Sequence, residues 1–471
     1  MHWRLFLLSI QLFLCVDMHA SINKEEIINK IDVILAENDV SKDDFSLSLR
    51  RVNRDNSLIS INSQRQRHPA SLIKIVTTLG ALEILGPNYY WETLFFTDGE
   101  VVGNNLIGNL FIKGTGDPFL TIEDIWKIIY EFRKLGIFNV EGQIFIDSTF
   151  FQNTYINRKQ IKNRLYEVEP NALMTNFKQI DFHIRMKNRV AEILHFPPLE
   201  NLKIKNQIRL SNKSCSPKNI NLFFTEDSYS KNVSISGEIP RSCKEYKLSR
   251  SVLSAEDYFF YLFKYIWEST DNGKLTSTYS FKKLPDNAIP LITWKSKNLS
   301  SVVKSTNKWS NNLMSKTLIY SLGYDSKVGQ ASPELGIKAI KNFLSAHKLS
   351  SNTLNIIDGS GLNKDVRAST EDIIRILNFA WTRNTMPEFV ASLSIAGKDG
   401  TTRNLFKGME LGNAARIKTG TLNEAISAGG YIFSNSGNIY SLAAIINKPY
   451  LNKNNARNTL ERIIKLITEK N

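Results

Sequence analysis

The most constraining feature of this sequence is a segment beginning at residue 69 that predicts a buried helix. Residues 69–79 read Pro-Ala-Ser-Leu-Ile-Lys-Ile-Val-Thr-Thr-Leu, and mostly apolar residues continue up to Gly86 and Pro87. An apolar stretch that ends at Gly-Pro is typical of a helix inside a core. Ser71 and Lys74 are three residues apart in its first turn, which places their β-carbons on one face, about 5–6 Å apart.

A hydroxyl beside an amine can act as a nucleophile and its base. A serine hydroxyl reacts slowly until its proton is removed, and burial lowers the pKa of a lysine amine enough to accept that proton. The N-terminal end of the helix also favours negative charge near Ser71. The alternative is that Ser71 caps the helix and Lys74 is solvated, because the same spacing recurs elsewhere, for example at Ser301 and Lys304. The pair therefore needs support from other parts of the chain.

The first twenty residues predict an export signal. A basic start at Arg4 precedes an apolar run over residues 5–16, and a small residue stands at Ala20. The run is too short to span a bilayer comfortably, so we expect cleavage and leave residues 1–20 out of the fold. A membrane anchor is the alternative.

The remaining chain has the composition of a globular protein. Of 471 residues, 42% are hydrophobic and 22% are charged, which is ordinary for folded domains. The formal charge of +15 could indicate nucleic acid, anionic lipid or an acidic polymer. Lys and Arg are scattered, however, and no nucleic-acid motif is present. For an exported protein we expect an anionic cell envelope and no nucleic-acid partner.

Cysteine and histidine usage constrains the covalent chemistry. Removal of the signal takes Cys15 with it and leaves Cys215 and Cys243. An even pair in an exported chain is a candidate disulfide closing a loop of about 28 residues, and two separate buried thiols are the alternative. The six histidines show no metal-ligand spacing, so we predict no metal site and no cofactor.

The two ends of the chain predict one shared sheet. Each end combines an amphipathic helical pattern with two alternating, strand-like runs. The helical patterns cover 27–35 and 460–467, and the strand-like runs cover 45–49, 58–61, 428–434 and 439–446. We expect an antiparallel sheet with both terminal helices packed across it, so that the last part of the chain closes the first domain.

The middle of the chain predicts insertions into that domain. Short alternating runs dominate it, with one helical stretch near 122–135 and a mostly strand-and-loop region near 172–250. We predict an α+β protein of three parts. These are a first domain from 21–92 and 286–471, an inserted α/β domain from 93–160 and 252–285, and a second, mostly-β insert over 161–251.

Two further motifs stand at the boundaries of predicted elements. Ser310-Asn311-Asn312 precedes a helical stretch, and Lys418-Thr419-Gly420-Thr421 precedes a strand-like run. In chain order, S-x-x-K, S-x-N and K-T-G match the active-site set of the serine penicillin-recognising enzymes, which are the penicillin-binding proteins and β-lactamases. Three motifs in this order are far more specific than any one of them.

The resemblance extends to one family within this group. The long insert between Ser71 and Ser310 resembles the class C low-molecular-mass penicillin-binding proteins, the D-alanyl-D-alanine carboxypeptidase and endopeptidase family that includes penicillin-binding protein 4. Other similar stretches are 114–118, 142–147, 358–362 and 396–401. The resemblance implies a penicillin-binding-protein or β-lactamase-like transpeptidase domain, an antiparallel sheet flanked by helices, with two smaller inserted domains rich in strand.

The resemblance also implies roles for individual residues. Ser71 would attack the substrate carbonyl and Lys74 would accept its proton, with the backbone N–H groups of Ser71 and Thr421 holding the oxyanion. Ser310 would pass a proton to the leaving amine with Lys418 nearby, and Asn312 would orient Lys74 and the substrate amide. The substrate carboxylate would be received by residues around the third motif, namely Lys418, Thr419, Gly420 and Thr421.

Contacts to the substrate side chain are implied for Asp147, Lys364 and Asn423. The family pattern would have arginine in place of Lys364 and glutamine in place of Asn423, which affects the preferred stem peptide. Ser360 lacks the complete G-x-S-x-G pattern and is predicted to be a turn residue. His68 is predicted to lie outside the site.

The implied function is that of an exported, periplasmic serine DD-peptidase. It would cleave terminal D-Ala-D-Ala bonds or cross-links of peptidoglycan, with β-lactams as covalent inhibitors and peripheral membrane association as an option. A β-lactamase or esterase on the same scaffold is one alternative, although the large insert is against it. A peptidoglycan-binding protein without catalysis is another, although the intact motifs are against it.

Overall fold

The two ends of the chain form one antiparallel sheet, as the sequence predicted. In this computed structural model its strand order is β19-β20-β21-β22-β1-β2, and every neighbouring pair is antiparallel. The strands are β1 (Phe45–Arg51), β2 (Ser57–Ile61), β19 (Ser394–Ile395), β20 (Ala415–Thr421), β21 (Ala425–Phe433) and β22 (Ile439–Asn447). The structure describes residues 24–152, 164–187, 190–199, 202–227, 232–276, 278–406, 414–434 and 436–469. The predicted export signal lies outside them.

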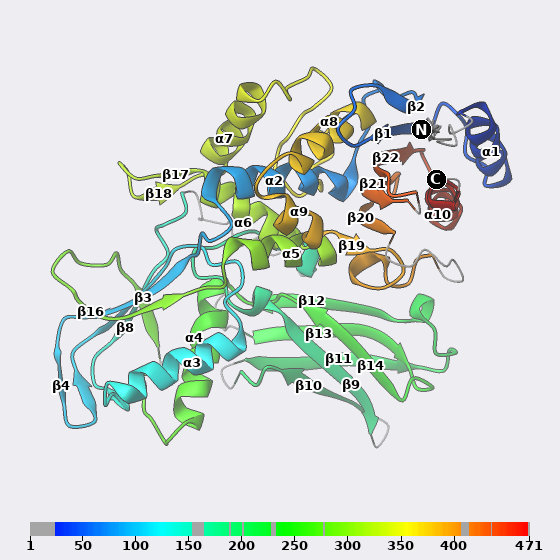
Figure 1. Cartoon of the computed structure of the whole chain (residues 1–471). Helices are drawn as coiled ribbons and strands as arrows, with labels where there is room; N and C mark the ends of the chain where they lie inside the picture. The colour runs from blue at the N-terminus through cyan, green and yellow to red at the C-terminus, as the bar shows by residue number, and fades with distance from the viewer. Residues whose placement is uncertain are drawn as a thin grey trace, which may run out of the picture.

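Helices cover both faces of this sheet (Figure 1). The terminal helices α1 (Lys24–Glu37) and α10 (Lys453–Glu469) pack on one face, and α2 (Lys74–Leu85) and α8 (Thr370–Trp381) pack on the other. Because side chains alternate along a strand, β22 serves both layers. Leu442 and Ala444 point into the core under the terminal helices, whereas Ala443 and Ile445 point into the core around α2.

The core around α2 explains why that helix is apolar on every side. Residues 74–82 of α2 are all buried, which is the pattern of a central helix rather than a surface one. Other helices surround it and complete the layer. They are α5 (Leu299–Trp309), α6 (Asn312–Leu322), α7 (Pro333–Ala346) and α9 (Met386–Ser392), and a short hairpin of β17 (Tyr324–Asp325) and β18 (Gln330–Ala331) lies between α6 and α7.

The first inserted region holds a five-stranded sheet of order β15-β8-β6-β3-β16. The helices α3 (Ile122–Lys134) and α4 (Ala255–Ser269) pack against it. The strands are β3 (Glu92–Thr97), β6 (Leu110–Gly114), β8 (Ile144–Asp147), β15 (Tyr279–Phe281) and β16 (Ile289–Lys295), and a small sheet adds β4 (Glu100–Val102), β5 (Asn105–Ile107) and β7 (Asn139–Val140).

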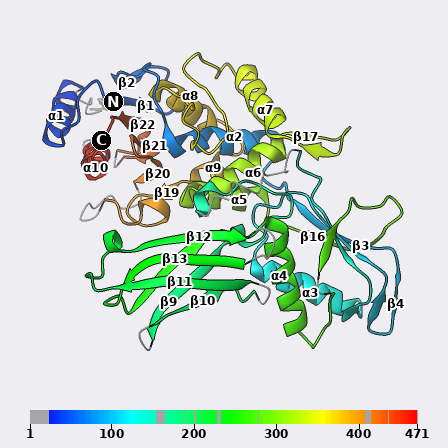
Figure 2. The same ribbon diagram turned by 180° about the vertical axis from the view of Figure 1, so that it is seen from behind.

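The second inserted region is built from two three-stranded sheets, seen from behind in Figure 2. Cys215 and Cys243 form a disulfide within it, which resolves the alternatives left by the sequence. One sheet contains β9 (Ile180–Lys187), β10 (Val190–Phe196) and β14 (Glu245–Arg250), and the other contains β11 (Lys203–Ser211), β12 (Asn221–Asp227) and β13 (Asn232–Pro240).

The two inserts share an apolar core. Phe182 and Val233 of the second insert belong to the same buried cluster as Phe95 and Phe259 of the first. Because one buried cluster includes residues of both inserts, the packing does not mark a boundary between them. The domain boundaries drawn from the sequence stay a prediction. Within the part of the chain that the structure describes, no helix combines the length and apolar character needed to cross a membrane.

Candidate active site

Ser71 lies in a tight turn that leads into α2. A 3-10 helix over Ala70–Ile73 precedes the α-helix, which begins only at Lys74. The sequence predicted one continuous helix from the first turn, so this is a correction. Ala70 has a φ of +49°, a left-handed conformation that is strained for a non-glycine residue. The chain therefore changes direction at Ala70, immediately before Ser71. In a 3-10 turn the side chains of i and i+3 eclipse each other, which brings Ser71 directly under Lys74.

The backbone ahead of Ser71 is held from both sides. The His68 ring accepts a hydrogen bond from the Ala70 N–H at 3.1 Å, and its other nitrogen lies 3.0 Å from the Asn363 carbonyl. The Asn447 side chain bonds to both the N–H and the carbonyl of His68. Gly361 packs so closely that a β-carbon there would lie 2.0 Å from the Ala70 carbonyl. His68 thus positions the turn that carries Ser71.

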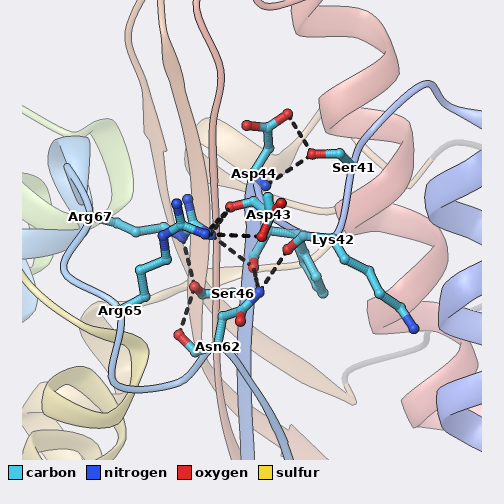
Figure 3. Close-up of polar contacts among 9 residues, drawn as sticks. Ser41, Lys42, Asp43, Asp44, Ser46, Asn62, Arg65 and Arg67 are labelled. Carbon is cyan, nitrogen blue, oxygen red and sulfur yellow. Dashed lines mark hydrogen bonds and ion pairs between the residues drawn. The ribbon is translucent and has the colours of Figure 1, made fainter.

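A buried arginine anchors the same segment one residue earlier (Figure 3). Arg67 is only 5% exposed, and its guanidinium donates to Ser46 Oγ at 2.6 Å and to the carbonyls of Asp43 and Phe45 at 2.6 and 3.0 Å. Burial lowers the pKa of Arg67 to about 10. The guanidinium ties the start of β1 to the chain entering the Ser71 turn.

Loss of this anchor should be measurable as stability. We expect Arg67→Met to lower the free energy of unfolding by about 2 kcal/mol, because buried acceptors lose their donor. The matched control is Arg65→Met, since Arg65 is half exposed and pairs with Asp43 at 3.3 Å. Such an exposed pair contributes about 0.5 kcal/mol or less. Urea unfolding of both variants tests this, and equal effects would contradict the anchoring role.

Lys74 is fully buried and makes three polar contacts. Its Nζ lies 3.0 Å from Ser71 Oγ, 2.7 Å from Asn312 Oδ1 and 2.5 Å from the Ser360 carbonyl oxygen. Burial lowers the pKa of Lys74 well below its ordinary value, and the charge of Lys418 lowers it further. A neutral amine has two hydrogens and one lone pair. Because the two carbonyl oxygens can only accept, they take the hydrogens and leave the lone pair for the Ser71 hydroxyl.

Asn312 is oriented for this contact. It opens α6, and its Nδ2 donates to the Tyr166 carbonyl at 3.1 Å. Since the amide nitrogen is used in that bond, the amide oxygen faces Lys74. Tyr166 comes from the inserted region, so the insert contributes directly to the arrangement around Lys74.

The second and third motifs meet in a separate contact. Lys418 is fully buried on β20, and its Nζ donates to Ser310 Oγ at 2.8 Å and to the Thr419 carbonyl at 2.6 Å. Burial lowers the pKa of Lys418 to about 7. Ser310 has a φ of +54° at the end of α5, which turns the chain sharply before α6 begins at Asn312.

Gly420 brings the third motif against the first. A β-carbon at Gly420 would lie 2.9 Å from both the Ser71 nitrogen and the Pro69 carbonyl oxygen, so only glycine allows β20 to approach Ser71 this closely. Ser427 of the next strand donates to the Pro69 carbonyl at 2.7 Å. The three motifs, distant in sequence, therefore converge on one site.

The side chains of the remaining predicted residues take no part in the contacts described above. The Asp147 carboxylate ends β8 and accepts from Thr149 Oγ1 at 2.6 Å and the Leu284 N–H at 2.9 Å. Burial alone would raise its pKa, but these bonds and Lys113 outweigh it and lower the pKa. Lys364 is exposed in a loop, and Asn423 accepts from Lys453 Nζ at 2.9 Å. Thr421 is exposed at the end of β20. A role of these side chains in substrate binding stays a prediction.

Comparison with known proteins adds independent information. Residues 27–470 match the peptidase S13 family, described as the D-Ala-D-Ala carboxypeptidase 3 (S13) family. The chain belongs to this family. It is 22% identical over 409 residues to the D-alanyl-D-alanine carboxypeptidase DacB of Haemophilus influenzae, covering 84% of either chain.

Solved structures confirm the fold class. The crystal structure of penicillin binding protein 4 (dacB) from Haemophilus influenzae matches with a TM-score of 0.76 at 20% identity, covering 90% of this chain and 95% of that one. The same protein complexed with a novel β-lactam matches with a TM-score of 0.75 at 19% identity, covering 93% and 99%. Membership of the S13 family confirms the enzyme class predicted from the three motifs, a serine-type D-Ala-D-Ala carboxypeptidase.

Sequence reasoning missed the backbone part of the site. Ser360 does lie in a turn, between Gly359 and Gly361 of positive φ, and its carbonyl oxygen, not its hydroxyl, contacts Lys74. Asp358 holds the turn by accepting from the Ser360 N–H and hydroxyl at 2.9 and 2.8 Å. The stretch 358–362 was a family-like signal, but no residue type reveals which carbonyl faces a lysine.

Proposed function

We propose that this S13-family chain is an exported, periplasmic peptidase that acts on peptidoglycan through an acyl-enzyme on Ser71. The observation that carries the proposal is the environment of Lys74, a buried amine beside Ser71 Oγ whose other contacts are two acceptor oxygens. Such an amine is neutral and ready to take a proton. The substrate would be a D-alanyl-D-alanine stem peptide or a peptide cross-link.

Acylation uses the first motif. Ser71 Oγ forms a bond to the substrate carbonyl carbon while its proton moves to the lone pair of Lys74. The carbonyl oxygen becomes an oxyanion between the backbone N–H groups of Ser71 and Thr421. Removing one donor of such a pair typically costs about 10²–10³ in rate. The close approach of Gly420 to the Ser71 nitrogen supports a pairing of these two N–H groups.

Breakdown of the tetrahedral intermediate uses the second and third motifs. As the C–N bond breaks, the Ser310 hydroxyl gives its proton to the leaving amine and takes one from Lys418 Nζ, 2.8 Å away. Acylation therefore leaves Lys74 protonated and Lys418 neutral. When water attacks the ester carbonyl, its proton passes through Ser310 to Lys418, and Lys74 returns its proton to Ser71 Oγ as the ester C–O bond breaks. Lys418, Thr419 and Thr421 receive the substrate carboxylate, for which an ammonium and hydroxyls are suitable donors.

The location and inhibitors follow from the same proposal. A peptidase that acts on peptidoglycan works in the cell envelope, and the basic, apolar start of the chain supports export. β-Lactams mimic the scissile amide and acylate Ser71. The similar penicillin binding protein 4 was solved in complex with a β-lactam, which supports the same behaviour here.

Labelling with a fluorescent penicillin tests the proposal. We expect a stable covalent adduct on the wild-type protein and none on Ser71→Ala. Rapid turnover of the penicillin without a lasting adduct would instead identify a β-lactamase, and no adduct at all a binding protein. Incubation with purified muropeptides, with and without cross-links, then separates carboxypeptidase from endopeptidase activity by the products released.

A further inference from the structure

A loop hydroxyl outside the three motifs touches the third motif directly. Thr401 Oγ1 lies 2.7 Å from Thr419 Oγ1, and both residues are half-buried. Thr401 belongs to a short 3-10 helix over Gly400–Thr402, between β19 and β20. Thr401 has no role in the proton transfers proposed above, so its contact with Thr419 is not explained by them.

Several hydrogen bonds hold the segment 395–402, which carries Thr401. The Asp399 carboxylate accepts from the Ile395 N–H at 2.7 Å and from Lys308 Nζ at 2.5 Å. Thr402 Oγ1 donates to the Ile395 carbonyl at 2.9 Å. The anchor Lys308 lies on α5, two residues before Ser310. The loop is therefore fixed to the helix that ends at the second motif while its hydroxyl contacts the third.

Gly400 makes the close approach possible. Its φ is +54°, and a β-carbon there would lie 2.3 Å from Ser394 Oγ and 2.4 Å from the Lys308 carbonyl. No other residue fits this position without displacing the backbone. The position of the Thr401 backbone is thus determined by the packing of Gly400 against Ser394 and Lys308.

We propose that Thr401 is a positioning residue for recognition of the substrate's terminal carboxylate, acting through the hydroxyl of Thr419. A hydroxyl has a single hydrogen to donate. A carboxylate only accepts, so Thr419 must give its hydrogen to the substrate. Thr401 then donates to Thr419 Oγ1, and the two hydroxyls form a chain pointing at the anion. Each bond in such a chain polarises the next.

This inference rests on the proposed function and adds a source of specificity. Without Thr401, the Thr419 hydroxyl loses this contact and is free to rotate away from the substrate. With it, the hydroxyl is held ready for an anion. A substrate that lacks the carboxylate gains nothing from this arrangement, so the effect of Thr401 should depend on the charge of the substrate's end.

The test compares two thiolester substrates with the same acyl group. The leaving group of one carries a carboxylate and that of the other a carboxamide, and kcat and KM are measured for the wild type, Thr401→Val and Thr401→Ser. Because a hydrogen bond to a charged group is strong, we expect Thr401→Val to lower kcat/KM for the acid about tenfold. For the carboxamide substrate, kcat/KM should change less than about twofold. Thr401→Ser keeps the hydroxyl and should restore kcat/KM for the carboxylate substrate.

The outcomes separate this inference from the proposed function. If Thr401→Val lowers kcat/KM equally for the carboxylate and carboxamide substrates, or does not lower it for the carboxylate substrate, the role of Thr401 is overturned. The proposed peptidase activity is unaffected by either result. A wild-type protein that hydrolyses neither thiolester would overturn the proposed function, and the inference with it. Thr401→Ala is measured as well, because it removes the hydroxyl without adding volume. It gives the same test if the valine variant does not fold.

Discussion

Replacing Lys74 by methionine is expected to lower the second-order rate constant for acylation of Ser71 by penicillin by about 10³–10⁴. Methionine has a similar length and fills the buried space, but it has no lone pair that can take the hydroxyl proton. The amine it replaces lies 3.0 Å from Ser71 Oγ and has its pKa lowered by burial. Stopped-flow or gel-based labelling with a fluorescent penicillin measures the rate constant directly.

The control is Lys74→Arg, which separates a base from a positive charge. A guanidinium stays protonated in proteins and cannot accept the hydroxyl proton. If Lys74 acts as a neutral base, both variants should be slow. If it acts only as a cation that attracts substrate, the arginine variant should retain much of the rate. A methionine variant that acylates as fast as the wild type would exclude Lys74 from the chemistry.

The pH dependence of acylation gives a second measure of the same residue. Only the neutral amine accepts a proton, so the wild-type rate should rise with pH until Lys74 is deprotonated and then level off. Burial and the charge of Lys418 both lower the pKa of Lys74. The rising part of the curve of rate against pH should therefore lie at a pH far below that at which an exposed lysine loses its proton. The Lys74→Met variant lacks the amine, so its acylation rate should not show this rise with pH.

The parts of the site that could be predicted from sequence depend on local geometry. Ser71 and Lys74 meet because a turn of helix places i and i+3 together, whatever surrounds them. The alternation of apolar residues in 45–49 likewise predicted β1, in which Leu47 and Leu49 face the core under the terminal helices. The paired patterns at the two ends of the chain predicted their shared sheet because an exposed apolar face must be covered.

The parts that could not be predicted depend on atoms that every residue has. The Ser360 and Tyr166 carbonyls complete the surroundings of Lys74 and Asn312, but a carbonyl gives no signal in a sequence. Arg67 is buried because backbone oxygens at the start of β1 receive it, although arginine is usually exposed. Thr401 reaches Thr419 only because a loop is fixed to α5. Each case is a tertiary contact that residue spacing cannot encode.

Replacing Lys418 by methionine is expected to change how the stability of the protein depends on pH. The amine is fully buried, and burial lowers its pKa to about 7 in the folded state, whereas the unfolded chain keeps the proton up to about 10.4. Between these values the unfolded state binds more protons. Lowering the pH therefore favours unfolding of the wild type, by up to about 1.4 kcal/mol per pH unit. The K418M variant has no such group and lacks this dependence.

Urea unfolding of both proteins from pH 6 to pH 10 measures the difference. Relative to the variant, the wild type should lose about 3.5 kcal/mol between pH 10 and pH 7 and change little below pH 6.5. Because the charge of Lys418 lowers the pKa of Lys74, the same comparison is repeated in a Lys74→Met background, in which the titration of Lys74 is absent from both proteins. Parallel stability curves would contradict the burial of an ionisable amine at position 418. If Lys418 receives the substrate carboxylate as proposed, the same titration governs recognition, because only the protonated amine attracts a carboxylate. We then expect the penicillin affinity of the wild type to fall over the pH range in which its stability rises.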